Sequence, residues 1–160
     1  MHGRALKNLT VMHVLLILGS VMLFTPSLAS AQGPGVRAGV AIDPDQLYFG
    51  GHFETGALVD RVHFRPSVEV GLGNDLTLVA LNFEFAYKFP RRNDWQLYAG
   101  GGPAVNLYSF DRGSDDREWD SEPGLNVLLG VEHAEGLFFE FKIGALDSPE
   151  FKFGVGWTFR

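Results

Sequence analysis

The chain ends in Phe151-Lys152-Phe153-Gly154-Val155-Gly156-Trp157-Thr158-Phe159-Arg160, a stretch that alternates large apolar side chains with glycine, polar or charged residues. Successive side chains of a β-strand point to opposite faces of a sheet, so a period of two predicts a strand with one apolar and one polar face. The same alternation runs back to about residue 35, and no stretch shows the helical period convincingly. The sequence therefore predicts an all-β protein.

Eight segments of this kind are predicted, at residues 35–42, 46–54, 64–72, 76–89, 95–109, 123–133, 137–146 and 150–159. Short runs such as Asp43-Pro44-Asp45 and Gly73-Asn74-Asp75 separate them, and these residue types favour tight turns. Hairpins joined in this way form an antiparallel meander. We expect an eight-stranded antiparallel up-and-down β-barrel.

Volume decides which face of this barrel points inward. An eight-stranded barrel has an interior that is only just filled by side chains, and the Phe, Trp, Leu and Val residues of the apolar face would overfill it. Glycine falls on the polar face, where it makes room for longer neighbours in a narrow lumen. These glycines are Gly50, Gly71, Gly100, Gly102, Gly130, Gly144, Gly154 and Gly156. The apolar face is therefore predicted to point outward.

An apolar exterior of this size aggregates in water, whereas a closed barrel satisfies every backbone group in lipid. Most of the predicted strands also reach the roughly 9–11 residues of a tilted membrane strand. We therefore expect a transmembrane barrel. The alternative is an apolar face that points inward, which would make the protein an exported soluble barrel with a lipocalin-like interior for a hydrophobic ligand.

An export signal is predicted at residues 1–31. Arg4 and Lys7 form a basic region, residues 11–24 an apolar core, and Ala29-Ser30-Ala31 a cleavage site, which leaves residues 32–160 as the barrel domain. The apolar run is shorter than the ~20 residues that a membrane-anchor helix needs, so the cleaved signal is the better interpretation.

Composition excludes several kinds of site and partner. The chain has no cysteine, which removes disulfides and thiolate metal sites. Without residues 1–31 it carries 11 basic and 19 acidic residues, a formal charge of −8. A net negative surface does not suit nucleic acid, because phosphate backbones require clustered Lys and Arg.

The longest connection, Asp111 to Glu122, indicates the direction of the chain through a membrane. External loops of outer-membrane barrels are the long ones, so this connection is expected outside the cell and the N-terminus in the periplasm. Aromatic residues then gather at the periplasmic rim, where girdles meet the lipid–water interface. The residues of this predicted girdle are Phe53, Phe64, Tyr87, Phe89, Trp95, Trp157 and Phe159.

Three stretches resemble the small eight-stranded outer-membrane β-barrels, a group that includes OmpX-like, OmpA-barrel-like and opacity-type surface proteins. They are residues 64–71 (FRPSVEVG), residues 98–104 (YAGGGPA) and the terminal stretch quoted above. The resemblance implies an outer-membrane location, contact with outer-membrane lipid, and a terminal aromatic residue that the assembly machinery recognises. Arg160 after Phe159 departs from that pattern. We expect a monomer.

Ten charged residues share the polar face of the predicted strands, with equal numbers of each sign. Buried charges must be paired or hydrogen-bonded, so the sequence predicts an ion-pair network that plugs the lumen. A gated ion path is the alternative, which balanced signs and bulky side chains disfavour. The residues are Arg37, Arg65, Lys88, Lys142, Lys152, Glu54, Glu69, Glu84, Glu132 and Glu140.

His52, Ser67 and Glu69 lie on the lumen face of neighbouring predicted strands, and such a set can activate a serine nucleophile. An outer-membrane lipid-modifying enzyme is therefore a further alternative, but the sequence has no G-x-S-x-G elbow. His52, His63 and His133 lack the spacing of metal ligands. We expect a structural or surface-interaction protein with no catalysis, no cofactor and no metal.

Acidic residues dominate the predicted external loop. Carboxylates can bind hard cations, and a charged loop can contact a partner. The spacing does not follow the D-x-[DN]-x-[DN]-G ligand pattern, so solvated surface charge is the prediction. The loop residues singled out are Asp111, Asp115, Asp116, Glu118, Trp119, Asp120 and Glu122.

Overall fold

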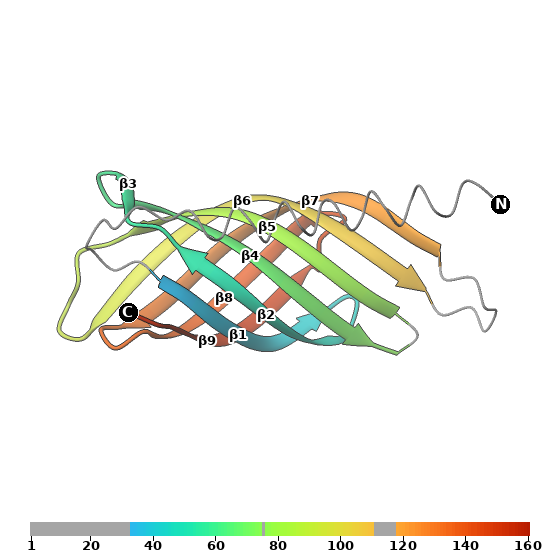
Figure 1. Ribbon diagram of the computed structural model, residues 1–160, viewed down its shortest axis with the longest axis horizontal. Coiled ribbons are helices and arrows are strands. Elements are labelled where there is room, and N and C mark those ends of the chain that lie inside the picture. Colours follow the sequence, from blue (N-terminus) through green and yellow to red (C-terminus); the bar gives the residue numbers. More distant parts are fainter. Residues whose placement is uncertain (1–32, 75, 111–117) are drawn as a thin grey trace.

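The computed structural model describes residues 33–74, 76–110 and 118–160. The predicted export signal at residues 1–31 and the loop residues Asp111, Asp115 and Asp116 lie outside them. No helix in the described part is long and apolar enough to cross a membrane. Figure 1 shows the strands, which are β1 (Gly33–Ile42), β2 (Gln46–Glu54), β3 (Ala57–Val59), β4 (Val62–Gly73), β5 (Leu76–Lys88), β6 (Trp95–Phe110), β7 (Glu118–His133), β8 (Leu137–Leu146) and β9 (Phe151–Thr158).

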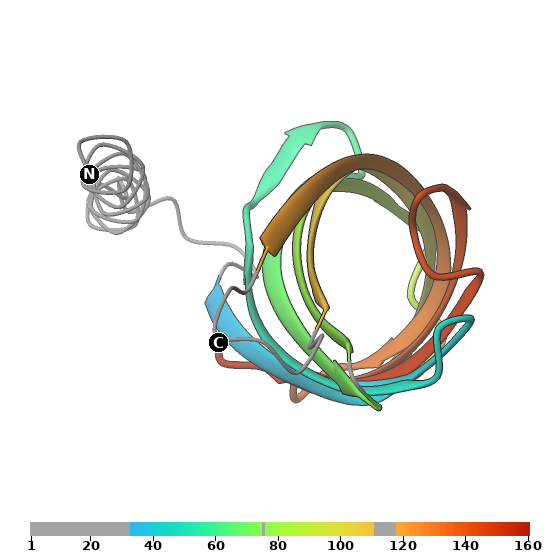
Figure 2. The ribbon, with the colours of Figure 1, turned by 90° about the vertical axis from the view of Figure 1, so that its right-hand side faces the viewer.

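Eight of these strands close into the barrel that Figure 2 shows end on. The ring runs β1, β2, β4, β5, β6, β7, β8, β9, and it closes where β9 pairs with β1. All neighbouring strands are antiparallel and follow one another in chain order, with only the short β3 between β2 and β4. The predicted eight-stranded antiparallel up-and-down barrel is confirmed.

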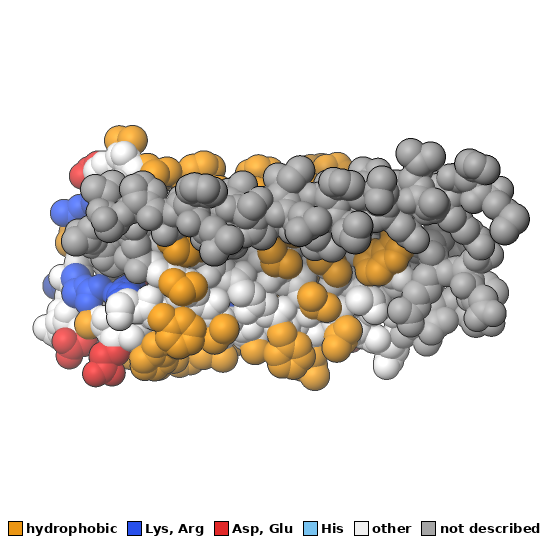
Figure 3. All heavy atoms as spheres, in the orientation of Figure 1, with side chains coloured by type: hydrophobic (Ala, Val, Ile, Leu, Met, Phe, Trp, Pro, Cys, Tyr) orange, Lys and Arg blue, Asp and Glu red, His pale blue; other side chains and the backbone are white. Residues whose placement is uncertain are grey.

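The registers keep the apolar and polar faces separate around the ring. Phe153 pairs with Phe141 on one side and with Val40 on the other, so outward side chains meet outward side chains. Phe153 is 55 % exposed, whereas Glu69 and Lys142 are each 1 % exposed. Hydrophobic side chains lie along the visible length of the barrel in Figure 3. The prediction that the apolar face points outward is confirmed, and the alternative of an apolar, ligand-binding interior is wrong.

The sequence predicts a plain connection at residues 55–63, but the structure has a short hairpin there. β3 pairs with β4 through Ala57↔His63 and Val59↔Val62, and the turn between them places Asp60 at a φ of 51°. β3 pairs with no other strand of the described residues, and Figure 2 shows it leaning out from the ring. Three apolar residues are too short a run to be recognised by their period.

β6 and β7 extend farther than the sequence predicts. Glu118 to Glu122 pair with Asn106 to Phe110, so Trp119 and Asp120 lie in β7 and the predicted loop is wrong in its second half. The backbone hydrogen bonds of a ladder do not depend on side-chain polarity. A strand that continues beyond an apolar belt therefore loses the alternation by which the sequence predicts it.

Inward-facing glycines leave space for aromatic rings in the lumen. A Cβ atom at Gly130 would collide with the ring of Tyr98, and one at Gly156 would collide with the ring of Phe138. Both rings are buried. The glycines on the polar face thus accommodate bulky neighbours, as the volume argument requires.

Gly130→Ala should lower the free energy of unfolding by about 1–3 kcal/mol, because the new methyl group overpacks the lumen against Tyr98. Gly51→Ala is the matched control, since a Cβ at Gly51 would have only Gly35 O nearby, at 3.7 Å. Urea unfolding of both variants in detergent micelles, followed by tryptophan fluorescence, measures the difference. Equal midpoints for the two variants would contradict the packing role of Gly130.

Candidate functional site: the charged lumen

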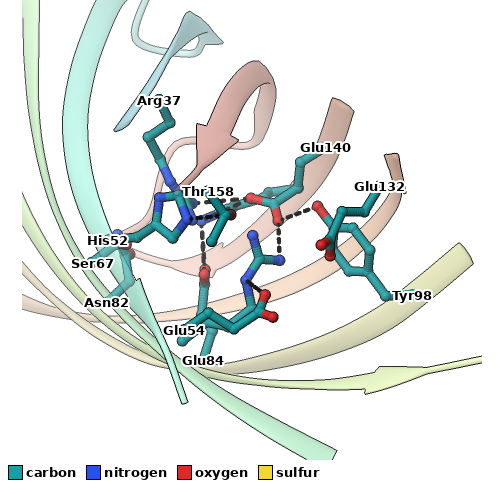
Figure 4. Close-up of polar contacts among 12 residues, drawn as sticks. Arg37, His52, Glu54, Ser67, Asn82, Glu84, Tyr98, Glu132, Glu140 and Thr158 are labelled. Atoms are coloured by element: carbon teal, nitrogen blue, oxygen red, sulfur yellow. Dashed lines mark hydrogen bonds and ion pairs between the residues drawn. The ribbon is translucent and has the colours of Figure 1, made fainter. Parts of the chain in front are cut away.

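The candidate site is the interior of the barrel, where the ten charged residues predicted for the lumen come together. They project from seven strands, because every second residue of each strand points inward. None of them is more than 4 % exposed. Figure 4 shows part of the cluster. The structure thus brings residues that are far apart in the sequence into a single buried set with five charges of each sign.

Lys142 on β8 holds the middle of the network. Its Nζ donates to both carboxylate oxygens of Glu84 at 2.7 and 2.9 Å and to Glu69 Oε1 at 3.3 Å. Lys152 on β9 donates to the other oxygen of Glu69 at 2.9 Å. These contacts join β4, β5, β8 and β9 across the lumen. Charge-assisted hydrogen bonds of this kind compensate for the loss of water around each ion.

Glu140 on β8 connects the two arginines. Arg37 Nη1 lies 3.1 Å from Glu140 Oε1, and Arg65 Nη1 lies 2.9 Å from Glu140 Oε2. The Tyr98 hydroxyl also donates to Oε2, at 2.9 Å. Arg37 in turn reaches Glu69 Oε1 at 3.2 Å. One carboxylate therefore links strands β1, β4, β6 and β8.

A further cluster occupies the end of the barrel at which the chain terminates. Lys88 Nζ lies 2.5 Å from Glu54 Oε1 and 2.7 Å from Glu132 Oε2. Arg65 Nε joins this cluster at 3.4 Å from Glu54 Oε2. Arg160 adds a sixth cation, because its guanidinium contacts Glu132 and donates to the carbonyl oxygen of Ala134 at 3.2 Å. Arg160 thus turns into the mouth of the barrel, while Phe159 faces outward and is 53 % exposed.

Two buried aromatic rings complete the packing, Tyr98 on the predicted polar face and Phe138, which the sequence analysis does not identify. The Arg65 guanidinium carbon lies 4.7 Å from the Tyr98 ring centroid and 5.2 Å from that of Phe138. Arg37 also lies over Phe138, at 5.5 Å. Cations over ring faces gain electrostatic stabilisation. The signal that could have revealed Phe138 is a large apolar residue at a position that the alternation reserves for polar side chains.

His52, Ser67 and Glu69, the residues considered for catalysis, make their hydrogen bonds to residues outside this set. His52 Nε2 is hydrogen-bonded to the Thr158 hydroxyl at 3.0 Å, and Ser67 Oγ accepts from Asn82 Nδ2 at 3.0 Å. Glu69 is held by lysine and arginine partners. Within residues 33–74, 76–110 and 118–160, no cluster of three His, Cys, Asp or Glu residues is arranged to hold a metal ion.

The two rims of the barrel differ in composition. The antiparallel registers place all seven aromatic residues of the predicted girdle at the rim where the chain ends. At the opposite rim an open pocket of about 400 Å³ has Asp43, Asp120, Glu122, Asp147 and Glu150 in its lining. Asp120 and Glu122 are residues that the sequence assigns to the external loop. Their carboxylates belong to the wall of this acidic pocket.

Comparisons with known proteins identify the fold. No family profile and no curated protein matches the chain. Among solved structures, it is similar to Neisserial surface protein A, with a TM-score of 0.56 and 18 % sequence identity over 80 % of this chain and 95 % of that chain. The chain has the fold of a small eight-stranded outer-membrane barrel. At this identity the likeness shows the fold alone, so the predicted resemblance is confirmed at that level.

Glu140→Gln should lower the free energy of unfolding by about 3–5 kcal/mol, because it leaves Arg37 and Arg65 buried with too little negative charge. Glu135→Gln is the control, since the Glu135 side chain is 76 % exposed and its removal should change stability by less than about 0.5 kcal/mol. Urea unfolding in detergent micelles measures both. A Glu140→Gln midpoint that equals that of the wild type would show that the network does not stabilise the barrel.

Proposed function

We propose that the protein is an integral outer-membrane β-barrel with a plugged lumen and a structural or surface-interaction role, without catalysis. The observation that carries the proposal is the distribution of its side chains, since the exterior is apolar and the interior is charged. A monomer suffices, because the described strands close on themselves and leave no edge in the ring.

The apolar exterior supports the membrane location. Large apolar side chains are exposed on every strand of the ring, and examples are Val40, Phe49, Val70, Phe85, Leu97, Val127, Phe141 and Phe153. Apolar patches on soluble monomers are much smaller than a belt around a whole barrel. Lipid removes the cost of that exposure, and the closed ladder leaves few backbone groups unpaired.

The charged interior supports a plug. Ion pairs link the walls across the lumen, and the rings of Tyr98 and Phe138 fill the space between the arginines. The hydrogen bonds of His52 and Ser67 to partners other than each other favour a role without catalysis. The outcome that would favour a lipid-modifying enzyme is lipid turnover that Ser67→Ala abolishes.

We also propose that Phe159 is the aromatic residue that the outer-membrane assembly machinery recognises. Because side chains alternate, Arg160 points into the mouth of the barrel, whereas Phe159 lies on the lipid-facing side and is 53 % exposed. Cell fractionation tests the location, and recovery in the soluble periplasm without detergent would contradict the proposal.

A matched pair of arginine substitutions on β7 should distinguish a lipid-facing surface from a water-facing one. Val127 and Trp119 lie on the same face of that strand, Val127 in its middle and Trp119 near its end. Val127→Arg should cost about 2–4 kcal/mol in lipid vesicles and Trp119→Arg about 0–1 kcal/mol, since the cost of a charge rises toward the bilayer midplane. Folding titrations in phosphatidylcholine vesicles measure both, and equal small costs would contradict membrane insertion.

Purified protein in planar bilayers should show no sustained open conductance, because paired side chains occupy the lumen. Glu140→Gln, if it folds, serves as a comparison in which the central pairing is incomplete. Stable wild-type openings would contradict the plug while leaving the membrane location unaffected.

A further inference from the structure

The two rims of the barrel differ in charge. At the rim where the chain ends, the charged residues outside the lumen network are balanced in sign, since Arg61, Arg91 and Arg92 stand with Asp60, Asp94 and Glu135. At the opposite rim, the described charged residues outside the lumen are all acidic: Asp43, Asp45, Asp120, Glu122, Asp147 and Glu150. An anionic ligand would therefore be repelled by the second rim and accepted more readily at the first.

Arg92 is placed on the outer surface of the first rim. It forms an isolated antiparallel bridge with Trp95, and their backbones exchange hydrogen bonds of 3.0 and 3.2 Å. Residues directly opposite each other in such a bridge share one face. Trp95 points outward and is 42 % exposed, so the Arg92 side chain shares the lipid-facing side with it.

Apolar side chains surround this position on neighbouring strands. Tyr87 and Phe89 are each 39 % exposed and contact each other edge to face at 5.2 Å. The projecting β3 adds Leu58 and Val59, which are 57 % and 73 % exposed. The surface is continuous with the apolar belt and has the composition of an interface between acyl chains and headgroups, where amphipathic rings gather.

Arg61 lies beside this surface, and its guanidinium, like that of Arg92, is not neutralised. The carbonyl oxygen of Arg61 accepts from Lys88 N at 2.9 Å, which holds the β3–β4 turn next to the end of β5. In the described part of the chain, the side chains of Arg61 and Arg92 are exposed and make no ion pair or hydrogen bond. Arg91 differs, since its Nη2 donates to Gln96 Oε1 at 3.3 Å. Gln96 is the cross-strand partner of the lumen residue Glu132, so Arg91 turns toward the mouth.

We propose that Arg61 and Arg92, together with Tyr87, Phe89 and Trp95, form a binding surface for the headgroup and upper acyl chains of an anionic phospholipid. The proposal rests on the membrane location proposed above. Arginine binds phosphate oxygens through two parallel N–H donors, and the aromatic rings cover the chains below. The rim where the chain ends, called the arginine rim, would therefore face a leaflet of anionic phospholipid. The opposite rim, called the acidic rim, would face the other side of the membrane.

The tryptophans allow a direct test, because Trp95 lies at the arginine rim and Trp119 near the acidic rim. Two single-rim reporters are made, Trp119→Phe/Trp157→Phe, which retains Trp95, and Trp95→Phe/Trp157→Phe, which retains Trp119. Each is folded into phosphatidylcholine vesicles that contain brominated phosphatidylglycerol or brominated phosphatidylcholine. Fluorescence quenching by the two brominated lipids then gives the relative affinity of each rim for the anionic lipid.

At Trp95, brominated phosphatidylglycerol should bind about five-fold more tightly than brominated phosphatidylcholine. This is the ratio expected for about 1 kcal/mol from one arginine near the membrane surface. At Trp119 the ratio should be about one or lower, since like charges repel there. Arg61→Gln/Arg92→Gln should reduce the Trp95 ratio to about one, and the matched control Arg91→Gln should leave most of it.

A ratio of one at Trp95, the same ratio at both reporters, or a ratio that Arg61→Gln/Arg92→Gln leaves unchanged would each overturn the proposal. If that variant does not fold, added NaCl replaces it, because screening should reduce the Trp95 ratio of the otherwise unchanged reporter. A ratio that salt does not change would then overturn the proposal. Failure of the membrane location itself gives a different result, in which neither brominated lipid quenches either tryptophan.

Discussion

Pairing of opposite charges inside a narrow tube is the constraint on which the rest of this structure depends. Ten ionisable side chains are removed from water, and each would be strongly unfavourable alone. They are tolerated because the signs are equal in number and because Glu140 and Lys142 each contact several partners. The glycines that admit Tyr98 and Phe138 belong to the same constraint, since rings and ions must share a small volume. The bulky apolar side chains therefore lie on the outside of the barrel.

This arrangement has the opposite polarity to that of a soluble domain. In water, an apolar exterior and a charged core would favour aggregation and unfolding. In lipid, the same distribution stabilises the barrel, since the backbone is satisfied by the closed ladder and the exterior matches its solvent. The network also joins strands that are distant in the ring, because Arg65 on β4 reaches Glu140 on β8. The interior therefore acts as the packed core of the protein.

At the two rims, the separation between an apolar exterior and a charged interior ends. Beyond the apolar belt, the alternation of side chains ends and charged residues become frequent. The acidic pocket lies at one rim, and the arginines with their aromatic neighbours lie at the other. The composition of the protein thus differs along the axis of the barrel. The similarity to Neisserial surface protein A, at 18 % identity, concerns the fold and leaves these rims as features of this chain.

The sequence by itself determined the eight strands of the ring and their antiparallel order, and the small volume of the lumen then determined that the apolar face points outward. The sequence also determined which charges had to be paired, because Glu69, Lys142 and their neighbours on the polar face had to lie in the lumen. Only the tertiary structure decided the partners, since Arg37 contacts Glu140 across 103 positions of sequence. It also revealed Phe138 in the lumen, the β3 hairpin, and the extension of β7 through Trp119 and Asp120. Those features depend on register, ring closure and backbone hydrogen bonds between distant strands, and a local alternation of side chains carries no record of them.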